Sequence, residues 1–458
     1  MRHLAAWACG AAVVWMVGVA PAPSRAEVEG ARVSELAPVA ARAMVGDVDA
    51  ARVLRAAGPA GLSALVDAGV AEAGRAAAGD RRSINLDSLY ARSLDLVCAQ
   101  ADCASSRLYW YTDFAAARAE AERSGKPIVL LRLLGRLDEQ LSCANSRYFR
   151  LILYSDPAIS GWLRDNVVLY WTSERPVPQV SVDFGDGRRL VGTVTGNSIH
   201  YMLDSHGRLV DAMPGLHTPQ RFLAWLQDAG AMAGQWEPLD DKAFAARSRS
   251  EHERLDRKVL DELVAELVQS GWSKRAAREA WLAEPVPEEE AMPPTADEAA
   301  RLALSKSVAE SPLLAAVGRR PLAPEDSNAV STLALTRRWG AYLSPKTRAL
   351  VEAQAPAAAR EDLKAALLRL EVRLAKDGLR NEAFLHRAIH QEMARASGLW
   401  TWQNLNTWVY SELFLTPAYD PWLGLAPTEL LGALVAIAPS PDLAATAPAA
   451  SAPAAMAP

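Results

Sequence analysis

Cys143 has the clearest potential for chemistry in this sequence, because it is the odd cysteine once Cys9 is set aside and Cys98 is paired with Cys103. Of the four cysteines, Cys9 lies in a hydrophobic leader, and Cys98 and Cys103 lie close together. A cysteine attacks as its thiolate, which the partial positive charge and free N–H groups of a helix N-terminus favour. If Cys143 begins a helix, Arg147 supports the thiolate from one turn later. A buried small side chain is the other interpretation of a free cysteine.

The first 26 residues have the pattern of a secretory signal. Arg2 supplies the positive start, an apolar stretch runs from Leu4 to Ala20, and Ser24-Arg25-Ala26 offers small residues for cleavage. We therefore expect cleavage near Ala26 and a periplasmic or extracellular protein, with an uncleaved anchor as the alternative. Elsewhere the sequence has no apolar run long enough for a transmembrane helix, so we expect no stable membrane span after cleavage.

The expected compartment indicates how Cys98 and Cys103 pair. Neighbouring cysteines in an oxidising space predict a small-loop disulfide. A Cys-x4-Cys pair is also half of a metal site, but the sequence has no second pair to complete it.

His386 and His390 form a second candidate for chemistry. Their spacing of four in a strongly helical segment places both on one face, and Glu382 extends that stripe by one turn. Two histidines and a carboxylate can hold Zn²⁺ or another transition metal. The alternative is a structural or inter-domain role.

Tryptophans gather near the C-terminus, at Trp400, Trp402, Trp408 and Trp422. Leu405, Trp408, Val409 and Leu413 repeat at helical spacing, so most of this region is expected to be core. The following loop, Leu415–Gly424, contains two prolines and is predicted to be either a binding surface for peptide or glycan, or a segment that caps the helical region or docks it on the preceding domain.

The elements between 108 and 234 alternate between helix and strand. Asp113 caps a helix that ends at Gly125, and the run from Ile128 to Leu131 is typical of a buried parallel strand. Further helices, a second buried strand and two hairpins follow. Their expected positions are a helix over 142–153, a helix from Asp156-Pro157, a strand over Val167–Trp171, hairpins turning at 185–187 and 205–207, and a helix from Thr218-Pro219.

This order resembles the thioredoxin superfamily over residues 108–234. The likeness is closest to secreted bacterial thioredoxin-like domains, which place Gly-Lys-Pro before an apolar strand and Ser-Asp-Pro after the active-site helix. Gly125-Lys126-Pro127, Ser155-Asp156-Pro157 and the strand Val167–Tyr170 match these elements. Cys143 lies where such domains carry their first active-site cysteine.

The resemblance implies a degenerate site made of Cys143, Ser146 and Ser198. In the family, a second cysteine three residues after the first resolves mixed disulfides, and Ser146, which cannot bond to sulfur, stands there. Ser198 stands where the family places a cis-proline. Extra residues, 135–140, also separate the strand from Cys143. A Cys-x-x-Ser thiol can still form or isomerise a mixed disulfide, but it is not a self-contained oxidant or reductant.

The sequence thus predicts an α/β fold with a central thioredoxin-like domain and helical regions on both sides. Its segments are a signal peptide (1–26), a helical N-terminal region (27–107), the thioredoxin-like domain (108–234), a helical C-terminal domain (235–437) and a disordered Ala/Pro tail (438–458). A chain of 458 residues is long enough for two or three domains. The net charge of −5 leaves no basic excess for nucleic acid.

The expected function is that of an exported thioredoxin-like protein, non-catalytic or weakly catalytic, that binds envelope or secreted proteins. No cofactor is predicted. One alternative is a monothiol disulfide isomerase or thiol-transfer enzyme that uses Cys143. Another is a metal-binding helical module that uses His386 and His390.

Overall fold

The computed structural model describes residues 33–78, 88–193, 196–282, 324–334, 336, 338–340, 342–354, 363–414 and 416. The chain divides into two compact units between Ser93 and Leu94. The expected signal peptide and Ala/Pro tail lie outside the described residues. None of the helices in the described ranges is long and apolar enough to cross a membrane.

The first unit is helical in its described part. It contains α2 (Ala37–Met44), α3 (Val48–Ala56), α4 (Pro59–Ala77) and the start of α5 (Ser88–Cys98). Asp47 caps α3 by accepting a hydrogen bond from Ala50 N at 3.0 Å. Gly61 lets α4 approach the last turn of α3, because a Cβ there would lie 1.9 Å from the carbonyl oxygen of Leu54.

The second unit is built on a mixed five-stranded sheet, which confirms the α/β class. Its strands are β1 (Trp110–Tyr111), β2 (Ile128–Leu134), β3 (Val168–Arg175), β6 (Ser198–Leu203) and β7 (Leu209–Pro214), in the spatial order β1-β3-β2-β6-β7. The first three in that order are parallel, whereas β6 and β7 are antiparallel to their neighbours. Every residue of β6 and β7 is buried, so β7 is an edge strand that the rest of the unit covers.

Helices connect the strands largely where the sequence predicts them. They are α7 (Phe114–Ser124), α8 (Ala144–Tyr148) with the π-helical turn η1 (Phe149–Leu153), α9 (Pro157–Asn166) and α10 (Pro219–Trp236). Asp113, Asp156 and Thr218 each cap one of them by accepting backbone N–H groups. Gly125 ends α7 at φ +68°, a conformation that favours glycine.

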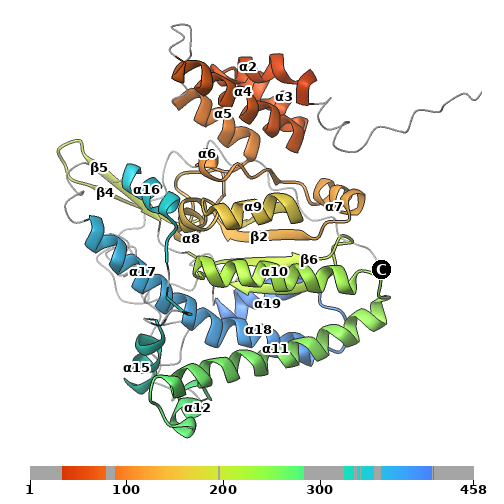
Figure 1. Cartoon of the computed structure of the whole chain (residues 1–458), viewed down its shortest axis with the longest axis vertical. Helices are drawn as coiled ribbons and strands as arrows, with labels where there is room; N and C mark the ends of the chain where they lie inside the picture. Colours follow the sequence, from red (N-terminus) through yellow and green to blue (C-terminus); the bar gives the residue numbers. More distant parts are fainter. Residues whose placement is uncertain are drawn as a thin grey trace, which may run out of the picture. The chain divides into compact units, whose positions relative to one another are not determined.

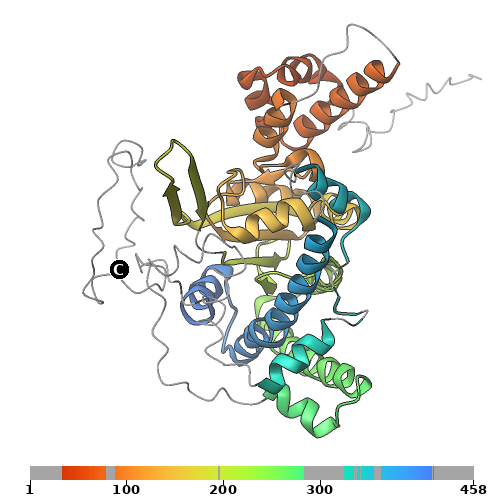
Figure 2. The same cartoon turned by 90° about the vertical axis from the view of Figure 1, so that its left-hand side faces the viewer.

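The predicted hairpin around 185–187 is a separate two-stranded sheet. It pairs β4 (Gln179–Asp183) with β5 (Arg189–Thr193). In both Figure 1 and Figure 2 this hairpin extends away from the five-stranded sheet.

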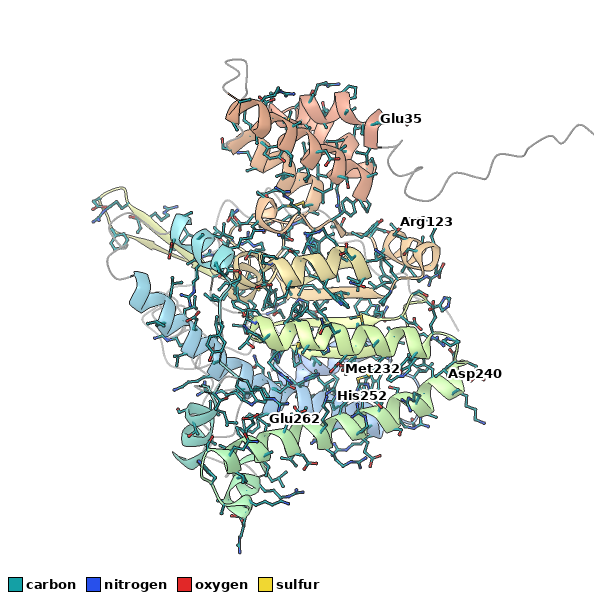
Figure 3. The ribbon with its side chains drawn as sticks, viewed as in Figure 1. Glu35, Arg123, Met232, Asp240, His252 and Glu262 are labelled. Carbon is teal, nitrogen blue, oxygen red and sulfur yellow. A yellow bond between two sulfur atoms is a disulfide. The ribbon has the colours of Figure 1, made fainter. Side chains whose placement is uncertain are left out.

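The C-terminal helices belong to the same compact unit as the sheet. They are α11 (Asp241–Gln269), α12 (Lys274–Leu282), α15 (Pro324–Leu333), α16 (Pro345–Gln354), α17 (Leu363–Arg380), η3 (Asn381–His386), α18 (Arg387–Arg395), α19 (Trp402–Trp408) and η4 (Val409–Leu413). Figure 1 shows α11 alongside α18, and Figure 3 labels Asp240, which precedes α11, and His252 within it. A single hydrophobic core contains residues of the sheet and of these helices.

Alternate residues of β6 face different helices. His200 packs against Phe222 and Trp225 of α10. Tyr201, its neighbour, donates a hydrogen bond to Asn406 Oδ1 of α19 at 3.1 Å. Helices therefore cover both faces of the sheet.

Arg208 joins the turn between β6 and β7 to the end of α10. Its guanidinium donates to the buried carboxylate of Asp204 at 2.6 Å and to the carbonyl oxygens of Glu237 and Leu239 at 2.8 and 2.6 Å. It also lies 4.4 Å from the ring centroid of Phe244 in α11. One side chain thus satisfies carbonyls that a helix end leaves without partners.

We expect the substitution Arg208→Met to lower the free energy of unfolding by about 3 kcal/mol, because it leaves the Asp204 carboxylate buried without its cation. Urea unfolding followed by tryptophan fluorescence measures the change. Arg188→Met is the matched control, since the Arg188 side chain is 75% exposed, pairs with Asp186 in the hairpin turn and lies 5.3 Å from the ring centroid of the exposed Phe184. The control should change stability by about 0.5 kcal/mol or less. Equal effects of the two variants would contradict this role of Arg208.

Candidate functional site

Cys143 lies at the start of α8, as the sequence predicts for a reactive thiol, but it is fully buried. It is the N-cap residue of the helix, and its sulfur accepts a hydrogen bond from Ser146 N at 3.4 Å. Its exposed fraction is 0%. The helix N-terminus is therefore present, while access for a disulfide substrate is not.

The structure brings Ser146 and Ser198 to the same buried polar cluster. Ser142 Oγ donates to Ser146 Oγ at 2.8 Å, and Asn145 Nδ2 donates to Ser198 Oγ at 2.9 Å. Ser198 begins β6 and is fully buried. Hydrogen bonds between hydroxyl and amide groups thus occupy the region where the resemblance places a second cysteine and a proline.

Arg150 is the cation that the sequence reading missed here. Arg147, the expected helper, is exposed. Arg150, in η1, is fully buried and donates to Asp102 Oδ2 at 2.8 Å. Burial lowers the pKa of Arg150, and the charge of Asp102 opposes this. Arg150 stands among the apolar residues Phe149, Leu151 and Ile152, but this pattern does not say which face of the helix is covered, so only the tertiary structure reveals its burial.

A disulfide joins Cys98, at the end of α5, to Cys103, which begins α6 (Cys103–Ser106). Asp95 Oδ1 accepts a hydrogen bond from Cys103 N at 2.8 Å. Burial, opposed by this bond and aided by the like charge of Asp102, raises the pKa of Asp95 from 3.8 to about 6.

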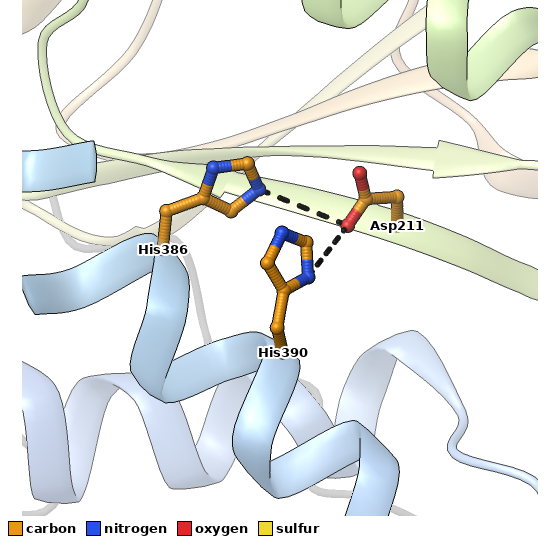
Figure 4. Close-up of side chains that lie close together, drawn as sticks. All are labelled: Asp211, His386 and His390. Carbon is orange, nitrogen blue, oxygen red and sulfur yellow. Dashed lines mark ion pairs between the residues drawn. The ribbon is translucent and has the colours of Figure 1, made fainter. Parts of the chain in front are cut away.

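A second buried cluster lies between β7 and the C-terminal helices. His386 in η3 and His390 in α18 project from successive turns toward Asp211 of β7, as Figure 4 shows. Asp211 Oδ1 lies 3.9 Å from His386 Nε2, 3.7 Å from His390 Nδ1 and 4.0 Å from Nδ1 of His252, in α11. All four residues are 4% exposed or less. The three residues drawn offer ligand atoms within 4.8 Å of one another.

Glu382, which the sequence places in a stripe with the two histidines, lies on the other side of His386. Its Oε2 is 3.3 Å from His386 Nδ1 and 3.7 Å from His217 Nδ1. Its Oε1 accepts a hydrogen bond from Arg221 at 2.5 Å. Glu382 thus holds His386 in place and does not face Asp211.

The charges of this cluster compensate one another. Burial lowers the pKa of His386, but the carboxylates of Glu382 and Asp211 outweigh it and raise this pKa to about 9. Burial raises the pKa of Glu382, but Arg221 and His386 hold it well below its usual range. Burial lowers the pKa of His390 and of His252. The protonated His386 and Arg221 therefore balance two buried carboxylates.

Asp211 and His252 were missed in the sequence, although each leaves a signal there. Asp211 is the single charged residue in the buried strand Leu209–Pro214. His252 lies seven positions from Ala245 and from Val259, which are buried on the same face of α11. A polar residue at a core position is the observation that marks both.

The described part of the C-terminal aromatic segment docks on the sheet. The Trp402 ring lies 5.8 Å from that of Phe114 and 6.4 Å from that of Tyr201. Tyr410 Oη donates to the Asn197 carbonyl at 3.4 Å. Leu405 and Val409 are buried, in agreement with the expected core, whereas the loop 415–424 lies outside the described residues except for Thr416.

Comparison of the chain with protein-family models, curated proteins and solved structures found no match. The chemistry of both clusters therefore has to be argued from their own geometry.

The raised pKa of Asp95 predicts a pH dependence of stability. Its pKa is higher in the folded protein (about 6) than in the unfolded chain (3.8), so its favourable contribution is complete below about pH 4 and is lost as the pH rises through 6. Asp95→Asn removes this loss, and the amide oxygen can still accept from Cys103 N. The variant should gain roughly 1–2 kcal/mol over the natural protein between about pH 4 and 7, a figure reduced for partial exposure. Urea unfolding without reductant, at several pH values, measures this gain. A stability difference that does not vary with pH would contradict the assignment.

Proposed function

We propose that this chain is an exported thioredoxin-like protein that acts by binding proteins of the cell envelope and has no thiol catalysis of its own. The sheet order β1-β3-β2-β6-β7, with β6 antiparallel to the other four strands, supports the thioredoxin-like assignment. So does the place of Cys143, at the N-terminus of the helix that follows β2. These features agree with the arrangement that the resemblance implies.

The burial of Cys143 is the observation that supports the absence of thiol catalysis. Attack on a disulfide requires a thiolate that reaches the substrate sulfur, and this thiol has no exposed surface. Ser146 and Ser198 are engaged in hydrogen bonds inside the protein, so the site serves packing better than exchange. The alternative function, that of a monothiol isomerase or thiol-transfer enzyme, would require a rearrangement that exposes Cys143.

Export is supported by the leader pattern in residues 1–26 and by the disulfide between Cys98 and Cys103. Disulfides persist in oxidising compartments and are rare in the cytosol. The net charge of −5 favours protein partners over nucleic acid.

Alkylation of Cys143 tests the non-catalytic proposal. In the folded protein near neutral pH, N-ethylmaleimide should label Cys143 only at the rate of unfolding, whereas in guanidinium it should label the thiol at once. Mass spectrometry follows the modification, and Cys143→Ser is the blank. Adding Ser250→Cys to that variant supplies a matched positive control, because Ser250 is exposed on α11. Rapid labelling of folded Cys143, or insulin reduction that is lost in Cys143→Ser, would overturn the proposal. Envelope proteins that co-purify should be the same for both forms.

Expression of the full chain in a bacterial host tests export. The protein recovered from the periplasm or medium should begin just after Ala26, as shown by N-terminal sequencing, and should contain the Cys98–Cys103 disulfide. A chain that stays in the cytoplasm with its leader intact would contradict the prediction. A membrane-bound product with the leader intact would instead indicate the uncleaved anchor.

A further inference from the structure

We propose that Asp211, His252, His386 and His390 form a closed binding site for one Zn²⁺ ion that joins the edge strand β7 to the helices α11 and α18. The site differs from the one that the sequence indicates, because Asp211 replaces Glu382 as the carboxylate ligand and His252 is added. It is independent of the proposed binding function and of Cys143.

Four of the six pairs of donor atoms already lie close to the spacing that a tetrahedral ion requires. Zinc binds imidazole nitrogen and carboxylate oxygen at about 2.0–2.2 Å, which places neighbouring donors roughly 3.4 Å apart. Asp211 Oδ1 is 3.7–4.0 Å from the three histidine nitrogens, and Nδ1 of His252 is 3.0 Å from Nδ1 of His390. Shifts of a few tenths of an ångström bring these four pairs to the distance expected around one ion. The nitrogens of His386 and His390, which lie within 4.8 Å of one another, close by up to about 1.4 Å.

Hydrogen bonds on the outer side of two rings orient their inner nitrogens for the metal. His252 Nε2 lies 3.0 Å from the Val210 carbonyl oxygen, which can only accept, so Nε2 carries the proton and the neutral ring keeps a lone pair on Nδ1. His386 Nδ1 lies 3.3 Å from the Glu382 carboxylate, so the lone pair of the neutral ring is on Nε2. Metal-binding histidines characteristically have such carbonyl and carboxylate partners.

His386 Nε2 provides an independent indication of a ligand. It is a buried polar atom with no hydrogen-bond partner in the described part of the chain. It faces Asp211 Oδ1 at 3.9 Å, too far for a hydrogen bond but suitable for two atoms that share an ion. An ion between them would give this nitrogen a partner. Ion binding releases the proton that His386 Nε2 otherwise carries.

Asp211 is held in a fixed orientation. Its Oδ2 accepts a hydrogen bond from Trp225 Nε1 at 2.9 Å, and its Oδ1 accepts one from Ala212 N at 2.8 Å. His390 donates to His252 in the hydrogen-bonded arrangement, and moving its proton to Nε2 frees Nδ1 for the ion. Because all four residues are buried, the site has the closed character of a structural zinc site.

The donor set selects the class of ion. Three imidazole nitrogens and one carboxylate oxygen suit Zn²⁺ and related transition metals, whereas Mg²⁺ and Ca²⁺ prefer oxygen ligands. The competing interpretation is a network of hydrogen bonds and ion pairs that binds no metal, and the experiment separates the two.

The test uses the mature full-length protein without a histidine tag, treated with a chelator and then dialysed. Titration calorimetry with Zn²⁺ and elemental analysis should give one ion per chain, and Zn²⁺ but not Mg²⁺ should raise Tm by several degrees. Co²⁺ should give the intense visible absorption of a four-coordinate site. A natural protein that retains no stoichiometric Zn²⁺ and shows no Tm shift overturns the proposal, whatever the variants do.

Variants separate ligands from bystanders. His386→Gln should weaken Zn²⁺ binding at least about 100-fold, while Glu382→Gln, which removes only an outer partner, should weaken it about tenfold. His200→Gln is the matched control, because His200 is equally buried but bonds to Tyr154 at 2.7 Å and not to the cluster. It should bind Zn²⁺ as the natural protein does. Unchanged affinity in a folded His386→Gln protein would overturn the proposal.

Discussion

The edge strand β7 imposes the constraint on which much of the second unit depends. An edge strand presents backbone N–H and carbonyl groups without strand partners, and these must be satisfied when the strand is buried. Here side chains do so: His252 bonds to the Val210 carbonyl, Asp211 to the N–H of Ala212, and His217 to the Pro214 carbonyl. Side chains such as His252 of the C-terminal helices thus supply hydrogen bonds that the edge strand lacks. This explains why these helices share one core with the sheet.

That solution brings charged and titratable groups into the interior, where each needs a partner. Asp211 and Glu382 are buried beside His386, and Arg221 pairs with Glu382. A metal ion at the inner nitrogens would strengthen the same junction without new secondary structure. The proposed zinc site therefore uses polar groups that are buried because β7 is covered. It would link three segments that lie far apart in the chain.

At the end of the sheet where Cys143 lies, the surrounding side chains are buried and pack against one another. The helix N-terminus is retained, while hydroxyl and amide side chains from α8 and β6 bond to one another around it. Cys143 is buried and Ser146 cannot bond to sulfur, so these two residues offer no route for dithiol exchange. The proposed binding role without thiol catalysis is consistent with this enclosure of Cys143.

The sequence by itself determined the local elements, because caps, glycines and apolar runs act over a few residues. Asp113, Asp156 and Thr218 begin helices where expected, and Gly125 ends one. It also placed His386 and His390 on one helical face. Only the tertiary structure decided that Cys143 is enclosed, that Glu382 lies behind His386, and that Asp211 and His252 face the histidines. Burial and donor geometry depend on which distant segments meet, and helical or strand periodicity carries no information about that.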